Sequence, residues 1–63
     1  MVILSKSLKY VVVHLTREEM IMAGVSSEYA VIDVFYDEQP MLSNVIGAFH
    51  SLESAEDWAM THE

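Results

Sequence analysis

The sequence predicts one small α+β domain: a three-stranded antiparallel β-sheet, a C-terminal α-helix packed on one face, and a short helical turn after the first strand. Residues 8–16 and 29–37 are rich in β-branched and aromatic side chains, which are typical of strands. The C-terminal segment instead repeats apolar residues at intervals of three and four, as one face of a helix does. A chain of 63 residues has room for a single domain, residues 1–63.

The first predicted strand is residues 8–16, LKYVVVHLT, which contains three consecutive valines. Alternation along a strand places its odd-numbered residues on one face of the sheet and its even-numbered residues on the other. Thr16 follows, and Glu19 stands three residues later, which is the pattern of a capping box. Gly24 is a favourable residue for ending a helix, so residues 17–23 are predicted to form a short helical turn.

The second and third predicted strands are residues 29–37, YAVIDVFYD, and residues 43–50, SNVIGAFH. Pro40 lies in the turn between them because it cannot donate to a β-ladder. The short link favours an antiparallel hairpin. Gly47 is expected at a bulge or at a close approach of the backbone.

The C-terminal helix is predicted to begin after Ser51, a favourable N-cap residue. Its first turns carry Glu53, Glu56 and Asp57, which the helix dipole favours near an N-terminus. Its apolar stripe consists of Leu52, Ala55, Trp58, Ala59 and Met60.

One helix can cover only one face of the sheet, and we expect it to cover the face that carries Ile32 and Val34. The expected core is Val11, Val13, Ile32, Val34, Phe49 and Trp58. The opposite face, which carries Asp33, then stays open although β-branched and aromatic residues surround the carboxylate. Exposed patches of this kind mark interaction sites. The predicted partner-binding residues are Tyr10, Val12, His14, Val31, Asp33, Phe35, Asp37 and Glu38.

The charges are distributed unevenly along the chain. All ten acidic residues lie from Glu18 onward, whereas the three cationic residues, Lys6, Lys9 and Arg17, precede them. The resulting net charge of −7 repels nucleic acid and attracts basic surfaces. We therefore expect a protein partner with a basic surface and no direct contact with nucleic acid.

The composition also bears on stability and location. The chain has no cysteine, so disulfides are excluded, yet 52% of its residues are hydrophobic. So small a core cannot bury all of that apolar surface, and a homodimer is expected. No stretch approaches the ~20 apolar residues that span a bilayer, so we expect no membrane association and a cytoplasmic location.

The expected function is that of a non-enzymatic protein-binding module. It would be a small acidic inhibitor or modulator, of the type encoded by viruses and mobile elements, that occludes a larger host protein or a basic nucleic-acid-binding surface. One alternative is a small homo-oligomeric assembly protein that pairs through its open sheet face. Another is a metal-binding or catalytic protein that uses His14, Asp33 and His50, if the strand register brings them together. The leading interpretation implies no catalytic residue, cofactor or metal, and no phosphate-binding loop is present.

Overall fold

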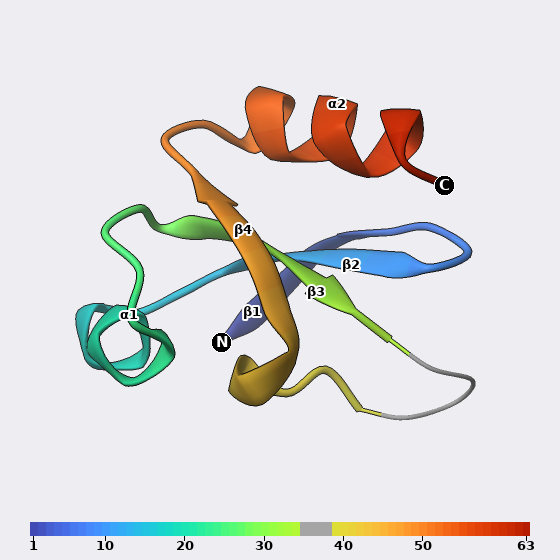
Figure 1. Cartoon of the computed structure of the whole chain (residues 1–63). Helices are drawn as coiled ribbons and strands as arrows, with labels where there is room; N and C mark the ends of the chain where they lie inside the picture. Colours follow the sequence, from blue (N-terminus) through green and yellow to red (C-terminus); the bar gives the residue numbers. More distant parts are fainter. Residues whose placement is uncertain (35–38) are drawn as a thin grey trace.

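A computed structural model, which describes residues 1–34 and 39–63, shows an antiparallel sheet with α2 on one face and α1 and η1 on the other side (Figure 1). The strands lie in the order β1-β2-β3-β4, and each neighbouring pair is antiparallel. Their bounds are β1 (Val2–Lys6), β2 (Tyr10–His14), β3 (Tyr29–Asp33) and β4 (Val45–Phe49). The helical elements are α1 (Arg17–Ala23), the 3₁₀ turn η1 (Leu42–Asn44) and α2 (Leu52–Thr61). The predicted α+β class, antiparallel sheet and C-terminal helix are confirmed.

The prediction of three strands is wrong, because Val2–Lys6 forms an additional edge strand, β1. It pairs with β2 through a tight turn, in which the Ser7 N–H donates to the Tyr10 carbonyl at 2.8 Å. Polar residues interrupt the apolar run at the end of β1 and obscure its strand character in the sequence. An edge strand tolerates such residues because one of its sides faces solvent. None of the helices in the described ranges is long and apolar enough to cross a membrane.

The local signals for the two helices are confirmed. Thr16 Oγ1 accepts a hydrogen bond from the Glu19 N–H at 3.2 Å, and a Glu19 carboxylate oxygen accepts one from the Thr16 N–H at 2.9 Å. Gly24 ends α1 in the left-handed conformation, with φ of 73°. Ser51 caps α2 by accepting a hydrogen bond from the Ser54 N–H at 3.2 Å.

The helix α2 covers the opposite face of the sheet from the one predicted. Its buried residues Ala55 and Ala59 pack on Val12 and Val31, so the expectation that it covers the face of Ile32 is wrong. The physical reason is that both faces of β2 and β3 are apolar, so strand alternation offers no polar face that would exclude the helix. The three valines of residues 11–13 are each at most 2% exposed, which requires cover on both sides.

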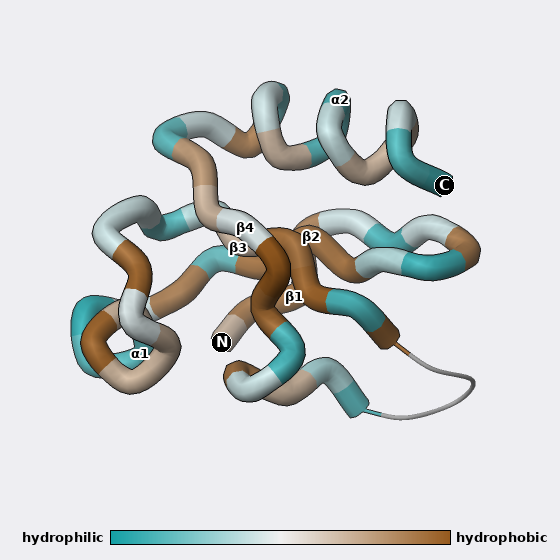
Figure 2. Tube along the Cα trace, viewed as in Figure 1, coloured by the Kyte–Doolittle hydropathy of each residue, from teal (hydrophilic) through white to brown (hydrophobic). Residues whose placement is uncertain are grey.

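The second face of the sheet has a cover of its own. A buried cluster on this side consists of Val11, Val13, Leu15, Ala30 and Ile32. Met20 of α1, Val25 and Leu42 of η1 pack against it, and α1 and η1 also contact each other. Figure 2 shows apolar residues concentrated along the centre of the sheet, between these two layers.

The expected core is therefore confirmed in part. Val11, Val13 and Ile32 are buried, whereas Val34, Phe49 and Trp58 are only half-buried. The last two belong to the cluster beneath α2, and Val34 belongs to the cluster on the other face.

The third predicted strand is shorter than expected and bulged. It corresponds to β4, and residues 43–44 belong to η1 instead. The β3–β4 register pairs Val31 with Gly47 and Ile32 with Val45, so Ile46 is the extra residue of a bulge next to the glycine. Residues 35–37 of the second predicted strand lie outside the described residues.

Candidate functional site

The face predicted to bind a partner is where α2 sits. Val12 and Val31 are buried beneath the helix, and Tyr10 packs against Trp58. The prediction that this face is open is therefore wrong. His14 and Asp33 lie half-buried at its margins, and Phe35, Asp37 and Glu38 lie outside the described residues.

The three residues of the metal or catalytic alternative do not come together. In the β2–β3 ladder His14 pairs with Tyr29 and Asp33 pairs with Tyr10, so the two are four residues apart along the strands, about 13 Å. His14 Nε2 lies 3.2 Å from a carboxylate oxygen of Glu28. Among the described residues, no group of three histidine, aspartate or glutamate side chains is placed to hold a metal ion.

A serine and a histidine do meet elsewhere in the fold. Ser27 Oγ lies 3.2 Å from His50 Nδ1, a geometry that nucleophile–base pairs also use. Ser27 is only 8% exposed. The contact ties the loop before β3 to the link between β4 and α2, and we interpret it as structural.

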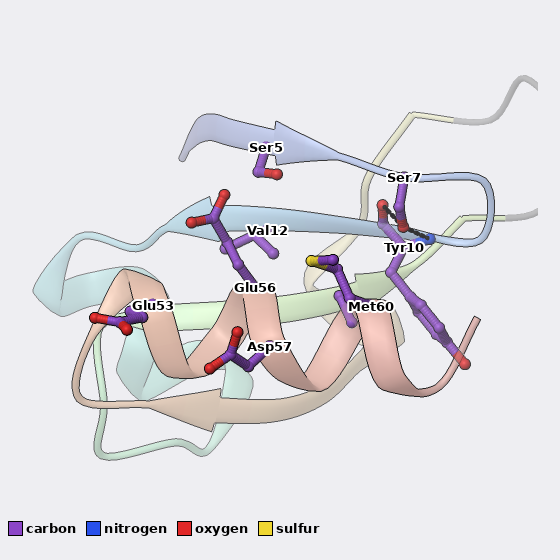
Figure 3. Close-up of a pocket in the computed structure, with 9 residues that line it drawn as sticks. Ser5, Ser7, Tyr10, Val12, Glu53, Glu56, Asp57 and Met60 are labelled. Atoms are coloured by element: carbon purple, nitrogen blue, oxygen red, sulfur yellow. Dashed lines mark hydrogen bonds between the residues drawn. The ribbon is translucent and has the colours of Figure 1, made fainter.

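A groove of about 200 Å³ lies between the β1–β2 hairpin and α2 (Figure 3). It forms because α2 packs on β2, β3 and β4, and the sheet continues past the helix to β1. The hairpin contributes Ser5, Ser7, Tyr10 and Val12. The helix contributes Glu53, Glu56, Asp57, Ala59 and Met60.

The groove combines an apolar floor with an acidic wall. Val12 and Ala59 form buried parts of the floor, and Figure 3 shows Glu56 and Met60 reaching from α2 towards the hairpin. The acidic residues of the wall are Glu53, Glu56 and Asp57. Glu56 and Asp57 follow Glu53 by three and four residues, about one helical turn, so all three lie along one side of the helix. No lysine or arginine follows residue 17, so α2 carries no cation to neutralise them.

This arrangement suits a lysine or arginine side chain from another molecule. The aliphatic stem of such a side chain packs on an apolar floor while its charged end reaches carboxylates at the rim. The two ion pairs between described residues use Glu19 and Glu28, and neither of these lines the groove.

Aromatic contacts and hydrogen bonds hold the two sides of the groove in place. Tyr10 and Trp58 meet edge to face with ring centroids 5.3 Å apart, and the ring of His62 stacks on Trp58 at 4.0 Å. The Tyr10 hydroxyl donates to the His62 carbonyl at 3.3 Å, and the Glu63 carboxylate accepts a hydrogen bond from the Leu8 N–H. The end of α2 is thereby tied to the tip of the hairpin.

The edge strand β1, which contributes Ser5 to the groove, also carries exposed apolar residues. Val2, Ile3 and Leu4 are all exposed, and the strand has one neighbour in the sheet, β2. Two signals in the sequence mark this region: the run VIL itself, and the absence of any acidic residue before Glu18. Of the groove residues, only Tyr10 and Val12 were among the predicted partner-binding residues.

Comparisons with protein-family models, with curated proteins and with solved structures find no match. The groove and the edge strand are therefore interpreted from their own chemistry.

Proposed function

We propose that the protein is a non-enzymatic binding module that takes a cationic segment of a partner protein into the groove between the β1–β2 hairpin and α2. By covering a basic surface in this way, it acts as an inhibitor or modulator of a larger protein. The observation that carries the proposal is the acidic wall of the groove above an apolar floor, because α2, which supplies this wall, lies in the part of the chain without lysine or arginine.

The charge of the chain favours encounter with such a partner. The segment from residue 18 carries ten acidic residues, whereas the three cations precede it. Complementary charge raises association rates and selects against anionic partners. A single exposed ion pair stabilises a complex by only ~0.2–1 kcal/mol, so contact with the apolar floor has to supply part of the affinity.

A short arginine-rich peptide is a suitable probe, with binding measured by calorimetry. We expect the double variant Glu53→Gln/Glu56→Gln to bind it about tenfold more weakly, which corresponds to ~1.4 kcal/mol. The control Glu18→Gln/Glu28→Gln makes the same change in net charge away from the groove, and it should retain most of the affinity. Equal losses in both variants would show that net charge alone attracts the peptide and would refute the groove as its site.

Homo-oligomeric assembly is a second candidate function, and it is favoured by the exposed apolar residues of β1. Assembly through the face that carries Val12 and Val31 is not proposed, because α2 buries that face. A catalytic role for His14, Asp33 and His50 lacks support, since His14 and Asp33 lie at opposite ends of the β2–β3 ladder.

A further inference from the structure

We propose that the groove binds a single arginine side chain in preference to lysine, and that Ser5 and Glu56 make this selection by accepting hydrogen bonds from the guanidinium. This selection rests on the proposed function and adds to it the identity of the side chain that the groove binds.

A β-bulge in β1 places Ser5 in the groove. The β1–β2 register pairs Ile3 with Val13 and then Ser5 with Val12, so Leu4 is the extra residue of the bulge. In an unbulged ladder, Leu4 would stand opposite Val12 and would turn an apolar side chain towards α2. With the bulge, the hydroxyl of Ser5 lies beside Val12 on the face that the helix covers. Bulges of this kind redirect side chains next to functional sites.

The groove is large enough for one long side chain. Pockets that enclose a whole small molecule measure roughly 300–1,000 Å³. This groove measures about 200 Å³, and Val12 and Ala59, which are at most 4% exposed, close its floor. An occupant therefore lies along the floor between the hairpin and the helix. The aliphatic stem of an arginine or lysine packs on apolar surface in this way.

On the helix side, Glu56 is the carboxylate that faces the groove. Figure 3 shows Glu56 and Met60 extending from α2 towards the hairpin, whereas Glu53 and Asp57 do not extend that way. Glu56 is also half-buried, and the other two acidic residues are exposed. Glu56 and Met60 are four residues apart, so their side chains are neighbours on the helix surface. They form the wall that an occupant of the groove would contact first.

Ser5 and Glu56 offer free hydrogen-bond acceptors on the two sides of the groove. Ser7 Oγ is already used, since it accepts a hydrogen bond from the Tyr10 N–H at 3.2 Å and donates one to the Tyr10 carbonyl at 3.1 Å. Within residues 1–34 and 39–63, Ser5 Oγ and the Glu56 carboxylate take part in no hydrogen bond or ion pair. Both side chains are half-buried. Partial burial of an unpaired carboxylate is costly, and a bound cation would remove that cost.

A guanidinium fits this pair of acceptors better than an ammonium does. It carries five N–H donors in a rigid, planar fork, so it can donate to Ser5 and Glu56 from different edges while its flat face packs on Met60. It is also more weakly hydrated than an ammonium, which favours its contact with the apolar floor. The ammonium of lysine is a compact, strongly hydrated charge and would retain its water at the rim of the groove. The groove therefore favours arginine.

Two peptides of equal charge test the selection. One is a short lysine-rich peptide with a single central arginine, and the other has lysine at that position as well. Calorimetry with wild type should show that the arginine-containing peptide binds about tenfold more tightly, a difference typical of one hydrogen bond to a charged group. Equal affinities would overturn the selection of arginine and leave the proposed function standing. If neither these peptides nor the arginine-rich peptide binds, both the selection and the proposed function are overturned.

Variants of the protein test the assignment to Ser5 and Glu56. Glu56→Gln keeps the shape of the side chain and removes its charge, so it should reduce the preference for arginine to about twofold or less. Ser5→Ala removes the second acceptor and should reduce the preference to about threefold. Circular dichroism checks that both variants are folded.

Glu53→Gln is the matched control, because it removes the same charge one turn earlier on α2 from an exposed residue. It should weaken the binding of both peptides alike, so the preference of about tenfold for arginine remains. A preference that survives in Glu56→Gln would overturn the assignment to Glu56. So would a preference that Glu53→Gln abolishes as completely as Glu56→Gln does.

Discussion

The rings of Tyr10 and Trp58 pack edge to face, with centroids 5.3 Å apart and planes inclined at 69°. The contact joins the start of β2 to α2, and the ring centroid of Phe49 lies 6.5 Å from that of Trp58. The position of the helix, and with it the width of the groove, therefore depends on the indole of Trp58.

Trp58→Ala should lower the free energy of unfolding by about 2 kcal/mol, less than the ~3–5 kcal/mol of a fully buried aromatic because Trp58 is half-buried. Tyr10→Phe keeps the ring and removes the exposed hydrogen bond to the His62 carbonyl, so it should cost about 0.5 kcal/mol. Urea denaturation measures both. Similar losses in the two variants would show that the hydrogen bond matters as much as ring packing.

Ala55→Asp should unfold the domain. Ala55 is fully buried between α2 and the sheet, and an unpaired carboxylate there loses several kcal/mol of hydration. A domain of this size has a total stability of only roughly 3–9 kcal/mol. Ser54→Asp is the matched control, since it adds the same charge to an exposed position near the N-terminus of α2. Circular dichroism should show a folded Ser54→Asp and an unfolded Ala55→Asp; a folded Ala55→Asp would contradict the packing of α2.

Gly24→Ala should destabilise the protein by about 1 kcal/mol, because φ at this position is 73° and a Cβ disfavours the left-handed conformation. Nothing lies within 4 Å of the position that a Cβ would occupy, so the cost comes from the backbone and not from a clash. Gly24→Asn should lose less, since asparagine tolerates this conformation better. Thermal denaturation of the three proteins checks this order, and an alanine variant as stable as wild type would exclude the expected strain.

Glu19 should make the stability of α1 depend on pH. Its hydrogen bond from the Thr16 backbone N–H, together with the nearby terminal ammonium, lowers the pKa of the carboxyl below the usual 4.5. A lowered pKa in the folded state stabilises the protein above the unfolded value, and this stabilisation is lost as the pH falls through the folded value. Wild type should therefore melt above Glu19→Gln at neutral pH, and the difference should shrink as the pH falls below about 4.5. A constant difference across this range would contradict a role for the charged carboxylate.

The sequence by itself determined the elements that depend on neighbouring residues. Thr16 and Glu19 mark the start of α1, Gly24 marks its end, and Ser51 marks the start of α2, because each acts on backbone groups within about one helical turn. Alternation also assigned the residues of β2 to two faces correctly, since this follows from the geometry of an extended chain.

Only the tertiary structure decided which face α2 covers. Ala55 and Ala59 are small enough to let the helix approach Val12 and Val31 closely, while Tyr10, Tyr29, Phe49, Leu52 and Trp58 surround the contact. The sequence indicates a helix with one apolar side and a sheet with two apolar faces. Packing of the helix on either face of the sheet agrees with the alternation of residues along the strands.

The candidate site likewise depends on contacts between distant parts of the chain. The groove exists because α2 packs on β2, β3 and β4 while the sheet extends past it to β1, which brings the acidic residues of α2 opposite Ser5 and Ser7. The pattern of apolar residues within each segment predicts which side chains share one face of a strand or helix. The packing of one segment on another, which sets what lies across the groove, depends on the shapes of surfaces that form only when the whole chain has folded.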